Sequence, residues 1–243
     1  PSNIPSELAR ARKDMTDRLL GNPIPNGELL RNLGLFMLPQ DLRRFLFLDE
    51  VYRQILGVHG VAMEFGVRWG RDLAVLQALR SIHEPFNYSR RIIGFDTFEG
   101  FTHLDAKDGG HPVVTPGAYG VSDGYETFLD KHLTALEQEA PVAHIKKFEL
   151  VKGDASETVH TWLSAHPEAV ISFAYFDMDV YRPTRDVLEA IRPRMPKGAI
   201  IGLDEVGLPE FPGETQALAE VFGLDAIRLV RSPYSNYESY FVL

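Results

Sequence analysis

The sequence predicts an α/β fold with a mostly parallel sheet and an N-terminal helical extension, and three observations support this. From Gly60 onward, short apolar runs alternate with longer amphipathic segments, which is the pattern of strand–helix units. Residues 1–57 instead show only helical spacing of apolar residues. The 243 residues are 44% hydrophobic, enough for the core of one domain and a modest extension. We therefore expect residues 1–57 to form the extension and residues 58–243 a single domain.

The extension is predicted to hold two helices, Glu7–Leu20 and Pro39–Leu56. The second begins with a proline at a position that tolerates it and stops at Gly57. Residues 21–27 between them, Gly-Asn-Pro-Ile-Pro-Asn-Gly, are rich in residues that break helices.

The domain is predicted to alternate strands and helices. Strands are expected at Val61–Phe65, Arg91–Phe95, Phe148–Val151, Ile171–Phe176 and Ala199–Leu203. Helices are expected at Gly70–His83, Ser156–His166, Thr184–Arg194 and Glu214–Phe222. The chain closes with two further runs, Ala226–Val230 and Tyr237–Val242, that are typical of an antiparallel hairpin. Together these make about seven strands in a Rossmann-like sheet.

Residues 97–122 are rich in Gly, Pro, Asp and His and show no periodicity. A loop of this length is uncommon in a compact domain without a functional reason, so we interpret it as a lid over a site. His103 and His111 lie in this loop, and surface positions are the simpler interpretation for both.

The composition excludes several classes of function. The net charge of -9 argues against a nucleic-acid partner, because phosphate binding needs a basic surface. There is no cysteine, so any metal must bind oxygen or imidazole. No apolar run approaches the roughly 20 residues that span a membrane. The N-terminus shows no secretory signal, so we expect a cytoplasmic protein without a membrane partner.

Ligands of open parallel sheets bind beyond the carboxyl ends of the strands, so we expect the functional residues of this chain to follow its strands. The first reads Glu64-Phe65-Gly66-Val67-Arg68-Trp69-Gly70. Gly66 and Gly70 would let the backbone approach a cofactor, and Glu64 could bind the ammonium of a methionyl group. The spacing is not the Gly-x-Gly-x-x-Gly of dinucleotide sites. The alternative is a tight turn with an incidental glutamate.

The next two strand ends each present an aspartate. Asp96 follows the second strand, where a carboxylate can accept hydrogen bonds from two ribose hydroxyls of NAD or S-adenosylmethionine. Its alternative role is to cap a turn. Asp154 follows the third strand and could contact an adenine amino group, or could belong to a helix start in which Asp154 or Ser156 is the N-cap.

The fourth and fifth strand ends together carry four carboxylates, Asp177, Asp179, Asp204 and Glu205. Like charges this close oppose folding unless a cation offsets them, and oxygen ligands suit magnesium, calcium or manganese. Such a cation could hold a hydroxyl and lower its pKa. One of Asp177 and Asp179 would then bind metal while the other acts as a base. Alternatively, Asp179 caps the next helix and the Asp204–Glu205 pair lies in a solvated loop.

The pattern resembles the macrocin O-methyltransferase family, whose metal-dependent members methylate sugar hydroxyls of macrolides and other natural products. The resemblance runs from Glu64 to about Glu214. Four segments carry it: residues 95–100 (Phe-Asp-Thr-Phe-Glu-Gly), 152–154 (Lys-Gly-Asp), 177–181 (Asp-Met-Asp-Val-Tyr) and 198–205 (Gly-Ala-Ile-Ile-Gly-Leu-Asp-Glu). Two features depart from the family: Glu205 stands where a second Asp is usual, and the turn after the first strand has fewer glycines.

The resemblance implies a class I methyltransferase fold that uses S-adenosylmethionine and Mg²⁺, with a small-molecule glycoside as acceptor. Asp179 would be the general base. The implied metal ligands are Asp177, Asp204 and Glu205. The implied cofactor contacts are Glu64, Gly66, Gly70, Asp96, Thr97, Phe98, Asp154, Ala155 and Asp177. The helices before Gly57 would mediate dimer contacts or shape the acceptor pocket, so we expect a homo-oligomer.

Two other functions compete with this interpretation. The first is an oxidoreductase that binds NAD through Glu64 and Asp96, against which the missing dinucleotide motif and the acidic cluster both count. The second is a non-catalytic sugar- or metal-binding protein that keeps the fold without the reaction.

Overall fold

The computed structural model describes residues 5–243, which divide into two compact units on either side of the boundary between Arg44 and Phe45. We call them the N-terminal unit and the sheet unit. The division falls inside α3 (Pro39–Gln54), earlier than the boundary expected at residue 57. The reason is that α3 buries Phe47, Leu48 and Val51 in a core of the sheet unit.

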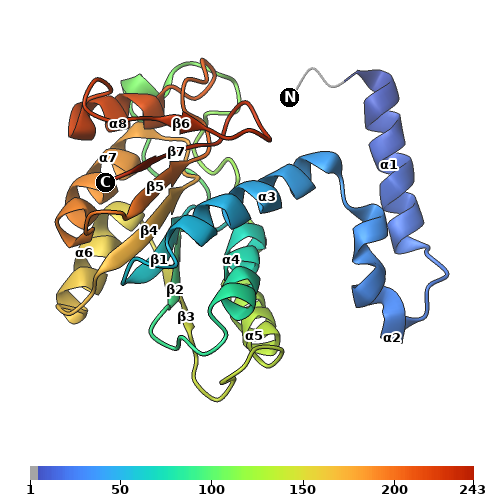
Figure 1. Cartoon of the computed structure of the whole chain (residues 1–243). Helices are drawn as coiled ribbons and strands as arrows, with labels where there is room; N and C mark the ends of the chain where they lie inside the picture. Colours follow the sequence, from blue (N-terminus) through green and yellow to red (C-terminus); the bar gives the residue numbers. More distant parts are fainter. Residues whose placement is uncertain (1–4) are drawn as a thin grey trace. The chain divides into compact units, whose positions relative to one another are not determined.

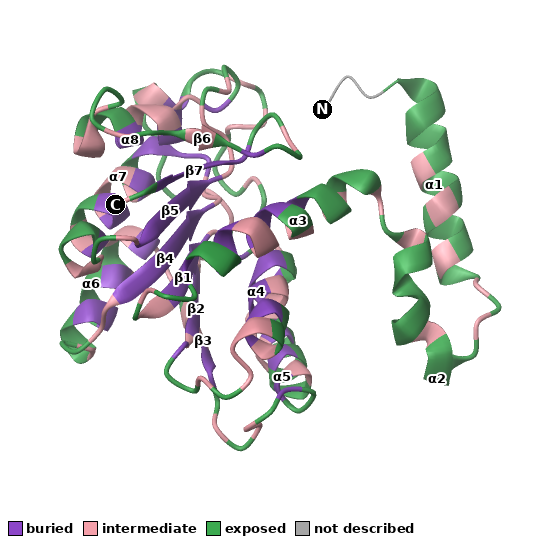
Figure 2. Cartoon of the chain, in the orientation of Figure 1, coloured by how far each residue is buried: buried purple, intermediate pink, exposed green. Residues whose placement is uncertain are grey.

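The N-terminal unit contains α1 (Ser6–Leu20), α2 (Asn26–Leu29), the 3₁₀ helix η1 (Leu30–Phe36) and the start of α3. The predicted helix 7–20 is confirmed, whereas α2 and η1 were not expected. None of α1, α2 and η1 buries a residue, and their ribbon in Figure 2 is green and pink without purple. Their exposed large apolar side chains are Leu8, Leu20, Leu30, Leu33 and Leu35.

Within residues 5–243, seven strands form one sheet in the order β3-β2-β1-β4-β5-β7-β6. The first five are parallel, and β7 runs antiparallel to β5 and β6 (Figure 1). The strands are β1 (Val61–Phe65), β2 (Ile92–Asp96), β3 (Phe148–Lys152), β4 (Ile171–Phe176), β5 (Ile200–Leu203), β6 (Val230–Arg231) and β7 (Ser239–Val242). The predicted Rossmann-like sheet is confirmed, and the chain closes with an antiparallel pair as expected. The first strand of that pair is only Val230–Arg231, because residues 226–229 form a turn and irregular backbone instead of the predicted strand 226–230.

Helices cover both faces of the sheet. One hydrophobic core joins the sheet to α6, α7 and α8, and the other joins it to α3, α4 and α5 (Figure 1). The bounds are α4 (Arg71–His83), α5 (Tyr125–Glu137), α6 (Ala155–Ala165), α7 (Tyr181–Ile191) and α8 (Gly213–Phe222), with 3₁₀ turns η2 (Ala106–Asp108) and η3 (Arg192–Arg194). No described helix is both long and apolar enough to cross a membrane.

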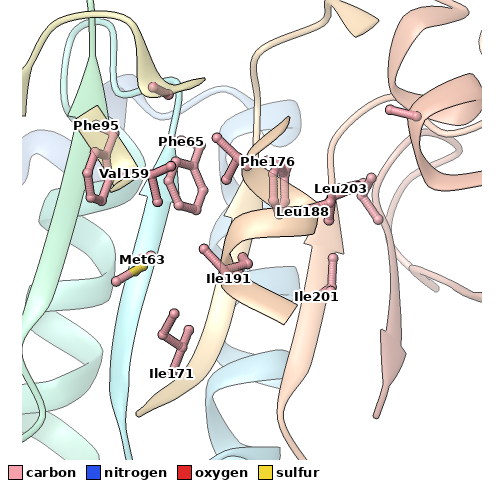
Figure 3. Close-up of a cluster of buried hydrophobic side chains, with 14 of the residues drawn as sticks. Met63, Phe65, Phe95, Val159, Ile171, Phe176, Leu188, Ile191, Ile201 and Leu203 are labelled. Carbon is pink, nitrogen blue, oxygen red and sulfur yellow. The ribbon is translucent and has the colours of Figure 1, made fainter. Parts of the chain in front are cut away.

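The strands build two cores because successive side chains point to opposite faces. In β1, Met63 and Phe65 belong to the core under α6–α8, and Ala62 to the other. The ring of Phe65 stacks between those of Phe95 and Phe176, at centroid distances of 4.9 and 5.1 Å. Figure 3 shows these rings at the ends of three adjacent strands. The strand ends are thereby fixed by buried aromatic packing.

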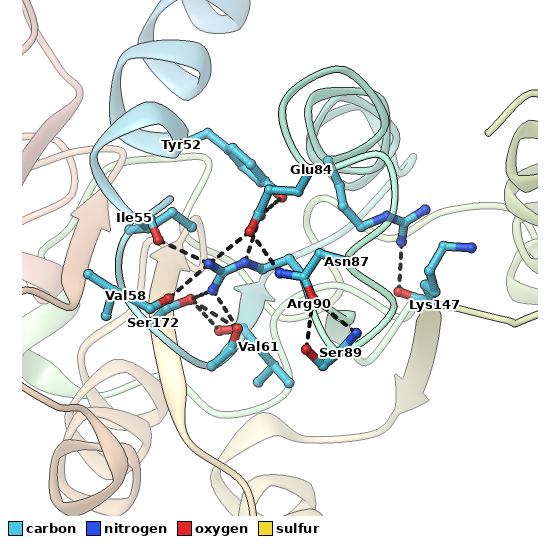
Figure 4. A network of polar contacts seen from close by, with 12 residues as sticks. Tyr52, Ile55, Val58, Val61, Glu84, Asn87, Ser89, Arg90, Lys147 and Ser172 are labelled. Carbon is cyan, nitrogen blue, oxygen red and sulfur yellow. Dashed lines mark hydrogen bonds and ion pairs between the residues drawn. The ribbon is translucent and has the colours of Figure 1, made fainter. Parts of the chain in front are cut away.

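A buried arginine, Arg90, hydrogen-bonds to residues at the ends of α3 and α4 (Figure 4). Arg90 is 2% exposed and donates to the carbonyls of Ile55 (3.0 Å) and Val58 (2.8 Å) and to the Glu84 carboxylate (2.8 Å). Tyr52 also donates to Glu84, at 2.8 Å. These bonds join the end of α3 to the end of α4, so the polar groups at this end are paired within the chain.

Two helices differ from the prediction. The helix α5 was not expected, although Leu129, Leu133 and Leu136 follow helical spacing. The helix α7 begins at Tyr181 rather than Thr184, and it gives way to η3 at Arg192 because Pro193 cannot continue it.

Candidate active site

The predicted site residues lie along one edge of the sheet, where backbone bonds hold the strand ends together. The Gly66 amide donates to Phe95 O at 2.9 Å, and the Asp177 amide donates to Phe65 O at 2.8 Å. The Asp204 amide donates to Phe176 O at 3.0 Å. The structure therefore brings the glycine turn after β1 next to the acidic residues that follow β4 and β5.

The two glycines after β1 are required by packing within the chain. Gly66 has a φ of +94°, and a Cβ there would lie 1.9 Å from the carbonyl oxygen of Asp177. Gly70 has a φ of +80°, and a Cβ there would lie 2.4 Å from Leu129. Glu64, two residues before Gly66, is buried at 1% exposure. Gly66 lets the ends of β1 and β4 approach closely, and Gly70 lets the turn before α4 pack against Leu129 of α5. The contact of either glycine with a cofactor stays a prediction.

Asp96 organises the turns after β1 and β2. Its Oδ2 accepts the Arg68 amide at 2.6 Å and its Oδ1 accepts the Phe98 amide at 2.5 Å. Burial raises the pKa of Asp96, and these backbone hydrogen bonds oppose the rise. The turn continues with Thr97, whose Oγ1 donates to Gly100 O at 2.9 Å. Asp96 thus caps turns, and because each carboxylate oxygen can accept more than one hydrogen bond, a ribose contact is compatible with this geometry.

Asp154 is the N-cap of α6, the simpler of its two predicted roles. Its Oδ1 accepts the amide and hydroxyl of Ser156, at 2.9 and 2.6 Å. Its Oδ2 faces the long loop, with Thr102 Oγ1 at 3.3 Å and His103 Nε2 at 3.6 Å. Ala155, the first residue of α6, is buried. The loop therefore reaches the position at which an adenine contact is predicted.

The acidic residues after β4 lie on a tight turn. Asp179 has a φ of +62°, and the amide of Val180 donates to the carbonyl of Met178 at 2.7 Å. The strand has ended here, so Asp177 and Asp179 are separated by a turn rather than by extended backbone. A left-handed aspartate is a strained conformation of a kind that occurs at functional sites.

A fifth carboxyl group joins the four that the sequence indicated. Glu214, near the start of α8, is fully buried and accepts the amides of Met178 and Glu205, each at 3.3 Å. Burial and the charges of Asp179 and Asp204 raise the pKa of Glu214 to about 8. Burial and the charges of Asp179, Asp204 and Glu214 raise the pKa of Glu205 to about 10.

The donor chemistry of this cluster suits a hard cation. Glu205 Oε2 is buried and accepts no hydrogen bond within the described part of the chain. Tyr175, buried in β4, donates to Asp204 Oδ1 at 3.4 Å. Among residues 5–243, no three His, Cys, Asp or Glu side chains are arranged to hold a metal as they stand. The residue types fit a divalent cation, and the carboxylates would have to draw together around it.

The long loop has internal order that its composition did not reveal. Phe101 and the segment 117–118 exchange backbone hydrogen bonds of 2.9 and 3.1 Å. The ring of Tyr119 packs edge-on against Phe101, and the Arg68 guanidinium lies 4.7 Å from its centroid. Burial, then the charges of Asp179 and Glu205, raise the pKa of Tyr119. The loop thus places an aromatic hydroxyl near the acidic cluster.

The middle of this loop is fixed to α7 and α8. Asp108 is 1% exposed, accepts the backbone amide of Tyr181 through Oδ1, and accepts the Asp105 amide through Oδ2 at 2.6 Å. Lys107 pairs with Glu220 of α8 at 2.9 Å. Asp108 thereby satisfies an N-terminal amide of α7 from far along the chain, which explains why that helix starts early.

Sequence reasoning did not identify Glu214, Asp108 or Tyr119 as site residues. Glu214 opens a predicted helix, where an acidic residue is ordinary, and the other two lie in a segment without periodicity. Their roles come from tertiary contacts, for which the local sequence gives no signal.

Comparison with known proteins identifies the family. Two structures of CalS11, a calicheamicin methyltransferase described as a TDP-rhamnose 3'-O-methyltransferase, resemble the whole chain. The first is 41% identical, with a TM-score of 0.96, and the match covers 99% of this chain and 94% of CalS11. The second is 39% identical, with a TM-score of 0.87, and covers 99% and 96%. No protein-family profile matches the sequence, and the comparison with curated proteins gave no match.

More distant structures share the fold. The O-methyltransferase NovP is 16% identical with a TM-score of 0.61, covering 83% of this chain and 79% of NovP. An O-methyltransferase from Bacillus cereus, solved with SAH, is 12% identical with a TM-score of 0.52 and covers 100% and 94%. The likeness to CalS11 favours neither the NAD-dependent oxidoreductase nor the non-catalytic binding protein. The chain belongs, with CalS11, to the macrocin O-methyltransferase-like family of S-adenosylmethionine-dependent sugar O-methyltransferases.

Proposed function

We propose that this enzyme methylates a hydroxyl of a deoxysugar in natural-product biosynthesis, with S-adenosylmethionine as donor and a divalent cation such as Mg²⁺ as activator. The observation that carries the proposal is the likeness to CalS11 over 99% of the chain at a TM-score of 0.96. CalS11 is described as acting on TDP-rhamnose. A TDP-deoxysugar is therefore the first acceptor to test, and the glycoside of a finished natural product is the second.

The cofactor would bind across the carboxyl ends of β1, β2 and β3. We assign the methionyl ammonium to Glu64, the ribose to Asp96 and the adenine to Asp154. The remaining proposed contacts are Gly66, Gly70, Thr97, Phe98, Ala155 and Asp177. Support comes from the positions of these residues at one edge of the sheet, where open α/β folds bind their ligands.

The cation would be held by Asp177, Asp204 and Glu205. Supporting this are the all-oxygen donor set and the buried Oε2 of Glu205, which accepts no hydrogen bond within residues 5–243. A divalent cation, when bound, acts as a Lewis acid that lowers the pKa of a hydroxyl.

The protein's own contribution is to move one proton and to orient the acceptor. Asp179, 9% exposed and fixed in a left-handed turn, would accept the proton of the sugar hydroxyl as general base. S-adenosylmethionine, when bound, would supply the methyl group to the deprotonated sugar oxygen, with the sulfur as leaving group. The loop 97–122, through Phe101 and Tyr119, would exclude water and hold the two reactants in near-attack geometry.

The test combines cofactor binding with methyl transfer. Calorimetry should show micromolar binding of S-adenosylmethionine to the wild type and loss of binding in Asp96→Ala. A methyl-transfer assay with TDP-rhamnose, with and without added Mg²⁺, should show turnover that Asp179→Asn reduces at least about 100-fold. The matched control, Asp225→Asn, changes an exposed aspartate and should leave turnover intact.

Each part of the proposal has its own contrary result. If the wild type shows no binding heat with S-adenosylmethionine, the cofactor assignment is wrong. If turnover is equal with Mg²⁺ and with a chelator, the cation has no role. If only a macrolide glycoside is methylated, the acceptor is the finished product rather than the nucleotide sugar.

We also propose a homo-oligomer in which the N-terminal unit supplies the contacts. The support is the set of exposed leucines in α1 and η1, two helices that bury no residue of their own. Light scattering after size exclusion should give a multiple of 27.3 kDa for the wild type. The Leu30→Ser/Leu35→Ser variant should shift toward the monomer, whereas Phe86→Ser, exposed in the sheet unit, should not. A monomeric wild type would contradict the proposal.

A further inference from the structure

The carboxylate of Glu214 connects the two acidic loops of the site. It belongs to α8, has no exposed surface, and lies nine residues or more from every other acidic residue of the cluster. Oε1 accepts the amide of Met178, from the loop after β4, and Oε2 accepts the amide of Glu205, from the loop after β5. Each of its two oxygens thus holds one loop.

The position of Glu214 is itself fixed by the residue before it. A Cβ on Gly213 would lie 2.6 Å from the backbone nitrogen of Tyr181 and 3.0 Å from the carbonyl oxygen of Asp179. The start of α8 therefore packs directly against the backbone of the loop after β4. Asp108, which holds the Tyr181 amide, would meet the same Cβ at 2.6 Å. The Glu214 side chain starts from backbone that has little freedom to move.

We propose that Glu214 is a positioning residue that sets the distance between the loop carrying Asp177 and Asp179 and the loop carrying Asp204 and Glu205. A carboxyl group can do this because each of its two oxygens keeps a lone pair that accepts an amide hydrogen, whether or not the group carries a proton. Glutamine offers one acceptor and one donor, so it can hold only one loop. Leucine has similar bulk and can hold neither. The effect on turnover rests on the methyl transfer proposed above.

The expected consequence is a loss in kcat without a loss in cofactor binding. The general base and the acidic side chains that it faces lie on the two bridged loops, and a displacement of about 1 Å in a reacting geometry costs on the order of 100-fold in rate. Asp96 is held separately, by the amides of Arg68 and Phe98. We therefore expect kcat to fall about tenfold in Glu214→Gln and about 100-fold in Glu214→Leu, with KM for S-adenosylmethionine within about twofold of wild type.

The experiment measures hydrogen exchange and kinetics on the same variants, well below their melting temperatures. In Glu214→Gln, the amide of Met178 or Glu205 should lose protection, and in Glu214→Leu both should, while the Arg68 and Phe98 amides keep theirs. The matched control is Glu137→Gln, which removes a buried, hydrogen-bonded carboxylate from α5. It should lower stability while kcat stays at the wild-type value.

The outcomes separate this inference from the proposed function. Lost protection at the two amides together with a fall in kcat supports the positioning role. Unchanged protection, or a fall in stability with unchanged kcat, overturns it. A wild type that methylates no acceptor would contradict the proposed function and the catalytic consequence of Glu214 together.

Discussion

The close approach of β1 and β4 gives a prediction that can be worked out from the structure. We consider Gly66→Ala, which adds one methyl group at a position with a φ of +94°. The new Cβ would lie 1.9 Å from the carbonyl oxygen of Asp177, far inside van der Waals contact. That carbonyl belongs to backbone whose amide is bonded to Phe65 O at 2.8 Å, so it cannot withdraw without breaking a bond of the sheet.

Gly66→Ala should lower the free energy of unfolding for two reasons, backbone conformation and steric overlap, and a second variant separates them. An L-residue in a left-handed conformation costs about 1–2 kcal/mol. Overpacking against fixed atoms adds about 1–3 kcal/mol. Gly124 has a φ of +71° with no atom within 4 Å of its Cβ position, so Gly124→Ala incurs the first cost alone. We expect Gly66→Ala to lose about 2–5 kcal/mol of unfolding free energy, out of the 5–15 kcal/mol typical of a folded protein.

Urea unfolding followed by circular dichroism measures both variants against the wild type. The midpoint of Gly66→Ala should fall well below that of Gly124→Ala, and its affinity for S-adenosylmethionine in calorimetry should fall as Asp177 is displaced. Equal destabilisation of the two variants would refute the reasoning, because it would mean that the backbone of β4 yields without cost.

Two further predictions concern the stability of the sheet unit. Burial alone would raise the pKa of Glu137, but bonds to Lys147 and Arg80 hold it below its ordinary value of 4.5. Glu137→Gln should therefore lower the free energy of unfolding by about 3–5 kcal/mol in urea at pH 7, where the carboxylate is ionised. The loss should shrink as the pH falls below about 4.5, because the wild-type carboxylate is then protonated. A loss that does not depend on pH would contradict the ion-pair explanation. Leu188→Ala removes a buried side chain of α7 and should lower the free energy of unfolding in urea by about 2–5 kcal/mol. The control Leu224→Ala, at an exposed position, should lower it by less than about 0.5 kcal/mol. Similar losses in the two variants would show that the core is not packed as described.

The elements that the sequence predicted best are two buried strands of the sheet. The strands β1 and β4 have the predicted bounds, Val61–Phe65 and Ile171–Phe176, because each is a short, mostly apolar run that a glycine or an aspartate ends. The helix α5 was missed because it follows a long irregular loop and begins after Gly124 in a left-handed conformation, although its leucines have helical spacing. The early start of α7 could not be predicted, since the acceptor for its first amide comes from Asp108.

The candidate site was predictable where it depends on strand ends and unpredictable where it depends on packing between loops. Three aspartates follow predicted strands: Asp96, Asp177 and Asp204. Pairing of the strands places their ends side by side, and this does not depend on the conformation of the loops. Glu214 reaches the same cluster from the start of a helix, through a contact with amides far away in the chain. An acidic residue at a helix start has an ordinary explanation, so its second role needs three-dimensional information.

The anchoring of the long loop at Asp108 has a consequence for how acceptor range can change. A loop fixed only at its ends shifts along its whole length when any part is lengthened or shortened. Here the buried carboxylate and the Lys107–Glu220 pair divide the loop into two arms, about residues 98–104 and 109–121, each with its own fixed ends. The hydrogen bonds between Phe101 and residues 117–118 join the two arms, so a change in one arm that spares these bonds would remodel one wall of the proposed acceptor pocket without moving Asp108.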